Sequence, residues 1–261
     1  MTRVLSGAAL IVFAVLIVWF APPVLFLAVA EALLVLGFVE YVGLARTSGF
    51  SVPPAVAGLA SALTCAAFAR PASRGLDAVL LSALVVLGAM ALPRWRGGAD
   101  ALGHVAASLF PLLYLGMPIG ALVSIRETWG REALFLLMLT VIVSDTAQYY
   151  TGRLFGRRLL APAISPKKTI EGAVGGFVCG TLLLVAVGRW WLPNVPLPLR
   201  AALGAAIVSL GIAGDLFESM LKRSAGVKDS SALIPGHGGV LDRIDALLFA
   251  APVYYVVLKY V

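Results

Sequence analysis

The sequence has little charge for its length. Aspartate, glutamate, lysine and arginine together make up 13% of the 261 residues, whereas hydrophobic residues make up 61%. A soluble domain is about half apolar and about a quarter charged. Because a soluble chain of this length could not bury so much apolar surface, the composition excludes an ordinary soluble protein. It predicts an integral membrane protein surrounded by a lipid bilayer.

Histidine and cysteine are scarce, with two residues of each type. Cys65 and Cys179 lie in separate apolar runs, so the sequence indicates neither a disulfide nor a cysteine-based metal site. His104 stands at the start of an apolar run, where we expect it to make a structural hydrogen bond rather than to bind a metal.

Acidic residues are outnumbered by basic residues, 13 to 20, which gives a net charge of +7. In a soluble protein this excess would suggest a nucleic-acid partner. Membrane proteins, however, concentrate lysine and arginine in their cytoplasmic loops. We therefore predict no nucleic-acid partner.

Long apolar runs are plentiful. A bilayer core about 30 Å thick is crossed by about 20 apolar residues of helix. The first run is longer than the roughly 7–15 residues of a signal-peptide core, so we expect it to be retained. The expected fold is all-α, a polytopic membrane protein of about nine transmembrane helices. They lie near residues 4–20, 22–44, 52–69, 76–92, 103–123, 132–153, 171–191, 200–222 and 240–259.

The basic residues are unevenly distributed between the two sides of these predicted helices. With the N-terminus in the cytoplasm, 13 of the 20 lysines and arginines face that side and 7 face the other. This bias predicts a cytoplasmic N-terminus. The two most basic loops, near residues 153–168 and 222–243, then both lie on the cytoplasmic face.

Residues 1–125 carry little chemistry, and we expect their helices to face lipid or a second copy of the chain. Glu31 and Glu40 are exceptions, because both fall within the second predicted helix. A carboxylate in a membrane span is costly and usually functional. Near a helix end it could instead meet water or Arg46, and the sequence leaves both interpretations open.

Residues 126–261 are expected to form the catalytic half. Asp145 precedes Arg153 by about 12 Å of helix, which places it within the bilayer, where an ionised group needs a partner. A polar contact between helices is the alternative interpretation.

A second group is basic. In "SPKKTIEG", Lys167 and Lys168 precede a predicted helix whose N-cap is Thr169 and whose first turn holds Glu171. Helix N-terminal amides and ammonium groups together make an anion site. Paired lysines at a membrane edge also occur as topology markers alone.

The last two predicted helices carry a third group. Asp215, Ser219 and Lys222 follow i, i+4, i+7 spacing and share one helix face. Asp242 and Asp245 share a face at the start of the last helix. Between the two helices, the glycines of "PGHGG" allow the backbone to approach a ligand closely and to form an anion-binding nest.

The predicted topology places four of these aspartates in the cytoplasmic halves of their helices. Several carboxylates in a medium of low dielectric would repel one another unless a cation joined them. Oxygen ligands suit Mg²⁺, and the nearby lysines and arginines would neutralise phosphate. The combination predicts a phosphoryl-transfer site, whereas a merely charged loop would not explain acids inside membrane spans.

The polar blocks of the C-terminal half resemble those of a known enzyme family. "SMLKRSAGVKDSSALIPGHGGVLDRID" resembles the signature of the phosphatidate cytidylyltransferase (CDP-diacylglycerol synthase) family in its S-x-x-K-R, K-D, P-x-H-G-G and D-R-x-D elements. "SDTAQYYTGRLFG" and "SPKKTIEG" resemble two further blocks of that family. The resemblance runs from Ser144 to the C-terminus; earlier residues share only hydrophobic spans. Gln148 departs from the family's usual alanine and bears on the packing beside Asp145.

The resemblance implies transfer of the cytidylyl group of CTP to phosphatidate, with release of pyrophosphate and Mg²⁺ as cofactor. It implies a homodimer in the cytoplasmic (inner) membrane with an active site on the cytoplasmic face. Whether a second, monovalent cation binds beside Mg²⁺ is left open. The residues expected in catalysis are Lys222, Arg223, Lys228 and His237. Those expected at substrate are Ser165, Lys167, Lys168, Ser219, Gly238, Gly239 and Arg243, and those expected at metal are Asp215, Asp242, Asp245 and Asp145.

Two other functions are compatible with parts of this pattern. A related enzyme could act on another lipid phosphate or transfer phosphate to a polyprenol with much the same catalytic half. A cation-coupled transporter also uses intramembrane acids and broken helices, but it would place acids at mid-depth and often shows inverted repeats.

Overall fold

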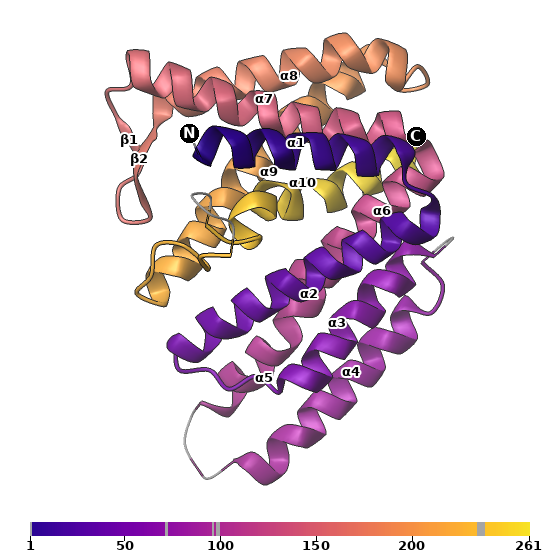
Figure 1. The fold of residues 1–261 in the computed structure, drawn as a ribbon, viewed down its shortest axis with the longest axis vertical. Helices are drawn as coiled ribbons and strands as arrows, with labels where there is room; N and C mark the ends of the chain where they lie inside the picture. Colours follow the sequence, from indigo (N-terminus) through magenta and orange to yellow (C-terminus); the bar gives the residue numbers. More distant parts are fainter. Residues whose placement is uncertain (1, 71–72, 96, 98–99, 234–237) are drawn as a thin grey trace. The chain divides into compact units, whose positions relative to one another are not determined.

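The computed structural model describes residues 2–70, 73–95, 97, 100–233 and 238–261. Within these residues nearly all regular structure is helical, which confirms an all-α membrane protein (Figure 1). The helices are α1 (Thr2–Phe20), α2 (Pro23–Thr47), α3 (Pro54–Ala69), α4 (Leu76–Ala91), η2 (Leu92–Arg94), α5 (Ala101–Pro111), η3 (Leu112–Gly116), α6 (Met117–Trp129), α7 (Arg131–Phe155), α8 (Ile170–Trp191), α9 (Leu197–Ser224) and α10 (Leu241–Lys259).

A helix forms over each of the nine stretches predicted from hydropathy. Five helical segments are long and apolar enough to cross a membrane in the part of the chain that the structure describes. They are Pro23–Thr47, Ala101–Trp129, Arg131–Phe155, Ile170–Trp191 and Leu197–Ser224. The fifth predicted stretch extends further than expected, because α5 continues through the π-helical η3 into α6. Pro111 lies at this transition, where its missing N–H interrupts the regular hydrogen-bond ladder.

The chain forms two compact units. Unit 1 comprises residues 1–124 together with 224–243, and unit 2 comprises residues 125–223 together with 244–261. The loop between α9 and α10, described over residues 225–233 and 238–240, therefore belongs with the N-terminal helices. We call it the signature loop, because it holds the central part of the family signature.

Small residues permit close helix packing in unit 1. α3 lies beside α2 and α4, and it also packs against η3 (Figure 1). A methyl group at Gly120 would lie 2.8 Å from the carbonyl oxygen of Cys65, and one at Gly116 would lie 2.8 Å from that of Ser61. Backbones approach this closely in membranes where glycine removes the side chain.

Unit 2 is built on α7 and α8, which lie side by side along their length (Figure 1). Methyl groups at Gly172 and Gly176 would each lie 2.8 Å from a backbone oxygen of α7. As predicted, Thr169 caps α8, since its Oγ1 accepts a hydrogen bond of 3.1 Å from the amide of Gly172. The small residues and the cap together fix the start of α8 beside the end of α7.

A hairpin stands where the sequence predicted an irregular basic loop. β1 (Leu159–Ala161) and β2 (Ser165–Thr169) pair antiparallel, with Leu159 opposite Thr169 and Ala161 opposite Ser165. Figure 1 shows the hairpin extending from the ends of α7 and α8. Strands of three and five residues are too short for an alternating apolar pattern to distinguish them from a loop.

Candidate functional site

Lys168 and Asp215 form an ion pair in unit 2. The Lys168 Nζ lies 2.6 Å from Asp215 Oδ2, and both side chains are partly buried. Lys168 comes from the hairpin and Asp215 from α9, so the pair joins the predicted anion-binding lysine to a predicted metal ligand. Ser219 Oγ also donates to Asp215 Oδ1 over 3.4 Å, as expected from their shared helix face.

Lys222 is buried rather than solvent-facing. Its ammonium group forms an ion pair with the carboxylate of Glu218, one turn earlier on α9. Glu218 is fully buried, and Lys222 is 8% exposed. The α9 face predicted from spacing therefore carries two acids, a hydroxyl and one base, and Glu218 is a member to which the sequence assigned no role.

The two paired acids, Asp215 and Glu218, also act on a further carboxylate. The negative charges of Asp215, Glu218 and Asp145 all act on the half-buried carboxyl group of Asp245. These side chains come from α7, α9 and α10, so acids of three helices influence one another within unit 2. Such mutual repulsion in a site of low dielectric favours binding of a cation.

Gln148 fills the space beside Asp145. Its Nε2 donates a hydrogen bond of 2.9 Å to Asp145 Oδ1 and one of 3.3 Å to Ser144 Oγ. Its side chain packs against Gly176 of α8, where an added methyl group would collide with it. The residue that departs from the family pattern is thus accommodated by a glycine and binds the aspartate directly.

The hairpin presents further basic groups. Lys167 is exposed on β2, and Ser165 is half-buried at its start. Arg223, at the end of α9, donates from Nε to the carbonyl oxygen of Ile164 over 3.3 Å. Glu171 Oε2 accepts hydrogen bonds from the amides of Arg157 and Arg158 and ties the chain before the hairpin to the start of α8.

Asp242 lies in unit 1, at the start of α10, and holds the signature loop. Its Oδ2 accepts hydrogen bonds from the amide of Ser230 at 3.1 Å, the hydroxyl of Ser230 at 2.8 Å and the amide of Gly239 at 2.8 Å. Gly238 adopts a φ of 77°, which favours glycine. This oxygen is engaged by the loop, so metal binding by Asp242 would rely on Oδ1.

The remaining predicted site residues are either exposed or lie outside the residues that the structure describes. Lys228 of the signature loop and Arg243 of α10 are both exposed. His237 lies outside the described residues, so its predicted role stays a prediction. His104 behaves as expected, because its Nδ1 accepts a hydrogen bond of 3.0 Å from the amide of Ser51 and its Nε2 lies 3.1 Å from Asp100.

The described residues do not form a ready-made metal cage. No group of three or more histidine, cysteine, aspartate or glutamate side chains is gathered closely enough to hold an ion within those residues. Mg²⁺ usually takes one or two carboxylates and completes its shell with water and phosphate oxygens. The carboxylates of Asp215, Asp245 and Asp145 fit that kind of site by their oxygen chemistry and mutual repulsion.

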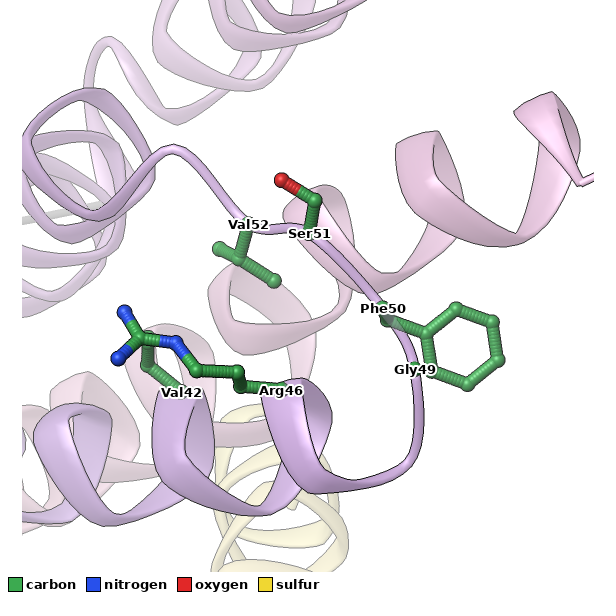
Figure 2. Close-up of a pocket in the computed structure, with 6 residues that line it drawn as sticks. All are labelled: Val42, Arg46, Gly49, Phe50, Ser51 and Val52. Atoms are coloured by element: carbon green, nitrogen blue, oxygen red, sulfur yellow. The ribbon is translucent and has the colours of Figure 1, made fainter.

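A small surface pocket lies in unit 1. It has a volume of about 240 Å³ and is formed by the end of α2 and the loop that follows (Figure 2). Its lining residues are Val42, Arg46, Gly49, Phe50, Ser51 and Val52. It contains none of the predicted site residues, so we do not assign the chemistry to it.

The buried Glu218–Lys222 pair makes a prediction about stability. Glu218→Gln would leave the Lys222 ammonium buried without its counter-charge, which costs about 3–5 kcal/mol. We expect the Tm in detergent micelles to fall by about 5–15 °C. The exposed pair of Glu132 with Arg131 provides the control, and Glu132→Gln should change the Tm by about 1 °C or less. Equal Tm values for the two variants would contradict a buried ionic pair.

Comparison with known proteins assigns the chain to a family. The model of the cytidylyltransferase family matches residues 1–261. A phosphatidate cytidylyltransferase of Helicobacter pylori strain J99 is 34% identical over 99% of this chain and 92% of its own length. One from Thermotoga maritima is 41% identical over 59% of each chain, and one from Haemophilus influenzae is 46% identical over 47% of this chain and 45% of its own. With its whole length matched, the chain belongs to the cytidylyltransferase family.

Proposed function

We propose that this protein transfers the cytidylyl group of CTP to phosphatidate, producing CDP-diacylglycerol and pyrophosphate for phospholipid synthesis. The observation that carries the proposal is the likeness over nearly the full chain to relatives named phosphatidate cytidylyltransferase. The signature Lys222-Arg223, Lys228-Asp229 and Asp242-Arg243 elements are all present.

The reaction asks mainly for neutralisation and alignment of charge. A phosphate oxygen of phosphatidate attacks the α-phosphorus of CTP, and the bond from that phosphorus to the pyrophosphate leaving group breaks. Since the nucleophile is already anionic, no strong general base is needed. Lys167 and Lys168 on the hairpin, with Lys222 and Arg223 on α9, are the cations that we assign to the phosphates.

Mg²⁺ is the cofactor that the carboxylates suit best. When bound, it would neutralise charge on the triphosphate, and Asp215, Asp245 and Asp145 would hold it. In the structure Asp215 is paired with Lys168. We propose that binding of the substrate and the ion breaks this pair, so that Lys168 would bind phosphate and Asp215 would bind the metal.

The membrane arrangement extends the proposal. We propose nine spans with a cytoplasmic N-terminus, an active site on the cytoplasmic face of the inner membrane, and a homodimer, as the family resemblance implies. The uneven distribution of 13 against 7 basic residues supports the orientation. Residues 126–261 would supply most of the catalytic groups.

Labelling of single cysteines tests the orientation. In a variant without Cys65 and Cys179, a cysteine introduced at Asp229 should react with an impermeant thiol reagent only from the cytoplasmic side. One introduced at Asn194 should react only from the opposite side. Both positions are exposed. The reverse pattern would place the signature loop on the side that lacks cytosolic CTP.

Substrate choice separates this function from its nearest alternative. Purified protein with radiolabelled CTP and Mg²⁺ is offered phosphatidate, a polyprenyl phosphate or another lipid phosphate. We expect labelled lipid to form with phosphatidate and to form at least about tenfold more slowly with the others, because the lipid phosphate is the aligned nucleophile. Preferential labelling of a polyprenyl phosphate would assign the chain to a different branch of lipid activation.

A further inference from the structure

Glu40 of α2 binds both sides of the signature loop. It is 6% exposed, and its carboxylate accepts four hydrogen bonds. Oε1 accepts from Ser231 Oγ at 2.7 Å and from the amide of Val240 at 2.9 Å. Oε2 accepts from Ser230 Oγ at 2.9 Å and from the amide of Leu241 at 2.9 Å. Each oxygen thus joins one hydroxyl before the glycine stretch to one amide after it.

This pattern uses the carboxylate completely. An ionised carboxylate offers about four lone-pair sites, and four donor groups lie within hydrogen-bond distance of Glu40, of which the Ser230 hydroxyl is shared with Asp242. The amides of Val240 and Leu241 lie at the N-terminus of α10, where backbone N–H groups lack helical partners and a negative charge is favoured. Glu40 therefore has little capacity left for a substrate or a metal, and among the described residues its hydrogen-bond donors all lie in the loop and at the helix start.

The same network reaches Asp242. Ser230 Oγ lies within hydrogen-bond distance of both Glu40 Oε2 and Asp242 Oδ2, and its single proton can be donated to only one of them at a time. The amides of Ser230 and Gly239 donate to Asp242 as well. Two carboxylates from distant parts of the sequence thereby hold one loop. Displacing Glu40 would release the serines and the start of α10 that carries Asp242.

We propose that Glu40 is a positioning residue, which holds Ser230, Ser231 and the start of α10 against α2 and so preorganises Asp242 and Gly239 for the reaction. The costly carboxylate in the second membrane helix is explained by these bonds. Its hydrogen-bond partners lie in the signature loop and at the start of α10, rather than at Arg46. The inference rests on the proposed function only for its effect on turnover, since the contacts themselves are independent of it.

Hydrogen–deuterium exchange of the full-length protein in micelles tests the positioning directly. In Glu40→Gln, one carboxylate oxygen becomes an NH₂ group, which cannot accept from the backbone amide on that side, although the serine hydroxyl beside it can turn to accept from the NH₂ group. We expect at least one of the amides of Val240 and Leu241 to exchange about tenfold faster, because one of them loses its acceptor, while those of α3 stay unchanged.

Glu31→Gln is the matched control, because Glu31 lies on the same helix beside the Cys65 thiol and accepts no hydrogen bond from the signature loop among the described residues. We expect it to leave the exchange of both α10 amides unchanged. Unchanged protection of these amides in Glu40→Gln would overturn the proposal. Equal acceleration throughout α2 and α3 would also overturn it, because Glu40 would then be structural only.

Turnover supplies the functional half of the test. Misplacement by about 1 Å can cost about a hundredfold in rate, so we expect Glu40→Gln to lower kcat by about 10–100-fold with little change in the KM for CTP. Glu31→Gln should stay within about twofold of the wild type. A kcat within about twofold for Glu40→Gln would overturn the positioning role. If the wild-type protein released no pyrophosphate, the proposed function would be refuted instead. The hydrogen-exchange result would still show whether Glu40 holds the start of α10.

Two further variants keep the test decisive. Should Glu40→Gln not fold, Glu40→Asp keeps the charge but withdraws the carboxylate by one methylene, and unchanged exchange at Val240 and Leu241 would then overturn the proposal. Ser231→Ala should lower kcat in the wild-type background and add little in a Glu40 variant, because its partner is already lost. Additive effects would contradict action through Glu40.

Discussion

Asp215→Asn is expected to lower turnover at least about a hundredfold while the protein still inserts and folds. The change removes a proposed Mg²⁺ ligand and the counter-charge of Lys168, whose ammonium lies 2.6 Å away. Loss of a group that stabilises developing charge costs several kcal/mol, and each 1.4 kcal/mol is about tenfold in rate. The measurement is pyrophosphate release at saturating Mg²⁺ and CTP.

Asp77→Asn provides the control for this variant. Asp77 is exposed in the first turn of α4 and is not among the proposed site residues. Its replacement should leave turnover within about twofold, in keeping with the small effect of most surface changes. Turnover of Asp215→Asn near that of Asp77→Asn would remove Asp215 from the metal site.

Gly239→Ala is expected to abolish most activity through a steric effect. A methyl group at this position would collide with Ser230 Oγ and with both carboxylate oxygens of Glu40. Overpacking of this kind typically costs about 1–3 kcal/mol. Because the collision falls on the atoms that hold the loop, we expect at least about a hundredfold loss of turnover and a lower Tm.

Gly43→Ala is the matched control on α2. A methyl group there would meet no atom within 4 Å apart from its chain neighbours and the backbone of its own helix. Alanine is also more stable than glycine in the interior of a helix. The Tm should stay the same or rise slightly, with turnover unchanged. If Gly239→Ala behaved like Gly43→Ala, the close approach of the signature loop to Glu40 would be irrelevant to catalysis.

The helices could be predicted from the sequence because lipid imposes a simple length and composition on them. Each predicted apolar stretch contains a helix, and the cap at Thr169 was also predictable, because capping is a local property of a few residues. The β1–β2 hairpin was missed, since β1 has only three residues and β2 is short and rich in polar residues. The passage of α5 through η3 into α6 likewise depends on tertiary packing around Pro111.

The sequence predicted which residues belong to the site but not which of them pair with one another. Spacing on α9 placed Asp215 and Ser219 together, as the structure shows. It gave no sign that Lys168 would pair with Asp215, because no local period links the hairpin to α9. Glu40 is the clearest case, since Ser230 lies 190 residues further along the chain and only the fold brings them together.

Release of pyrophosphate from CTP by the purified protein in detergent micelles tests the proposed function most directly. Release is expected only when phosphatidate and Mg²⁺ are both present, and without a sealed membrane or an ion gradient, because the chemistry joins two ligands at one site. Lys167→Ala and Lys222→Ala should each weaken it, since each removes positive charge assigned to phosphate. A well-folded, lipid-supplemented preparation that releases no pyrophosphate, and acts only across a sealed bilayer, would identify a transporter and contradict the enzyme.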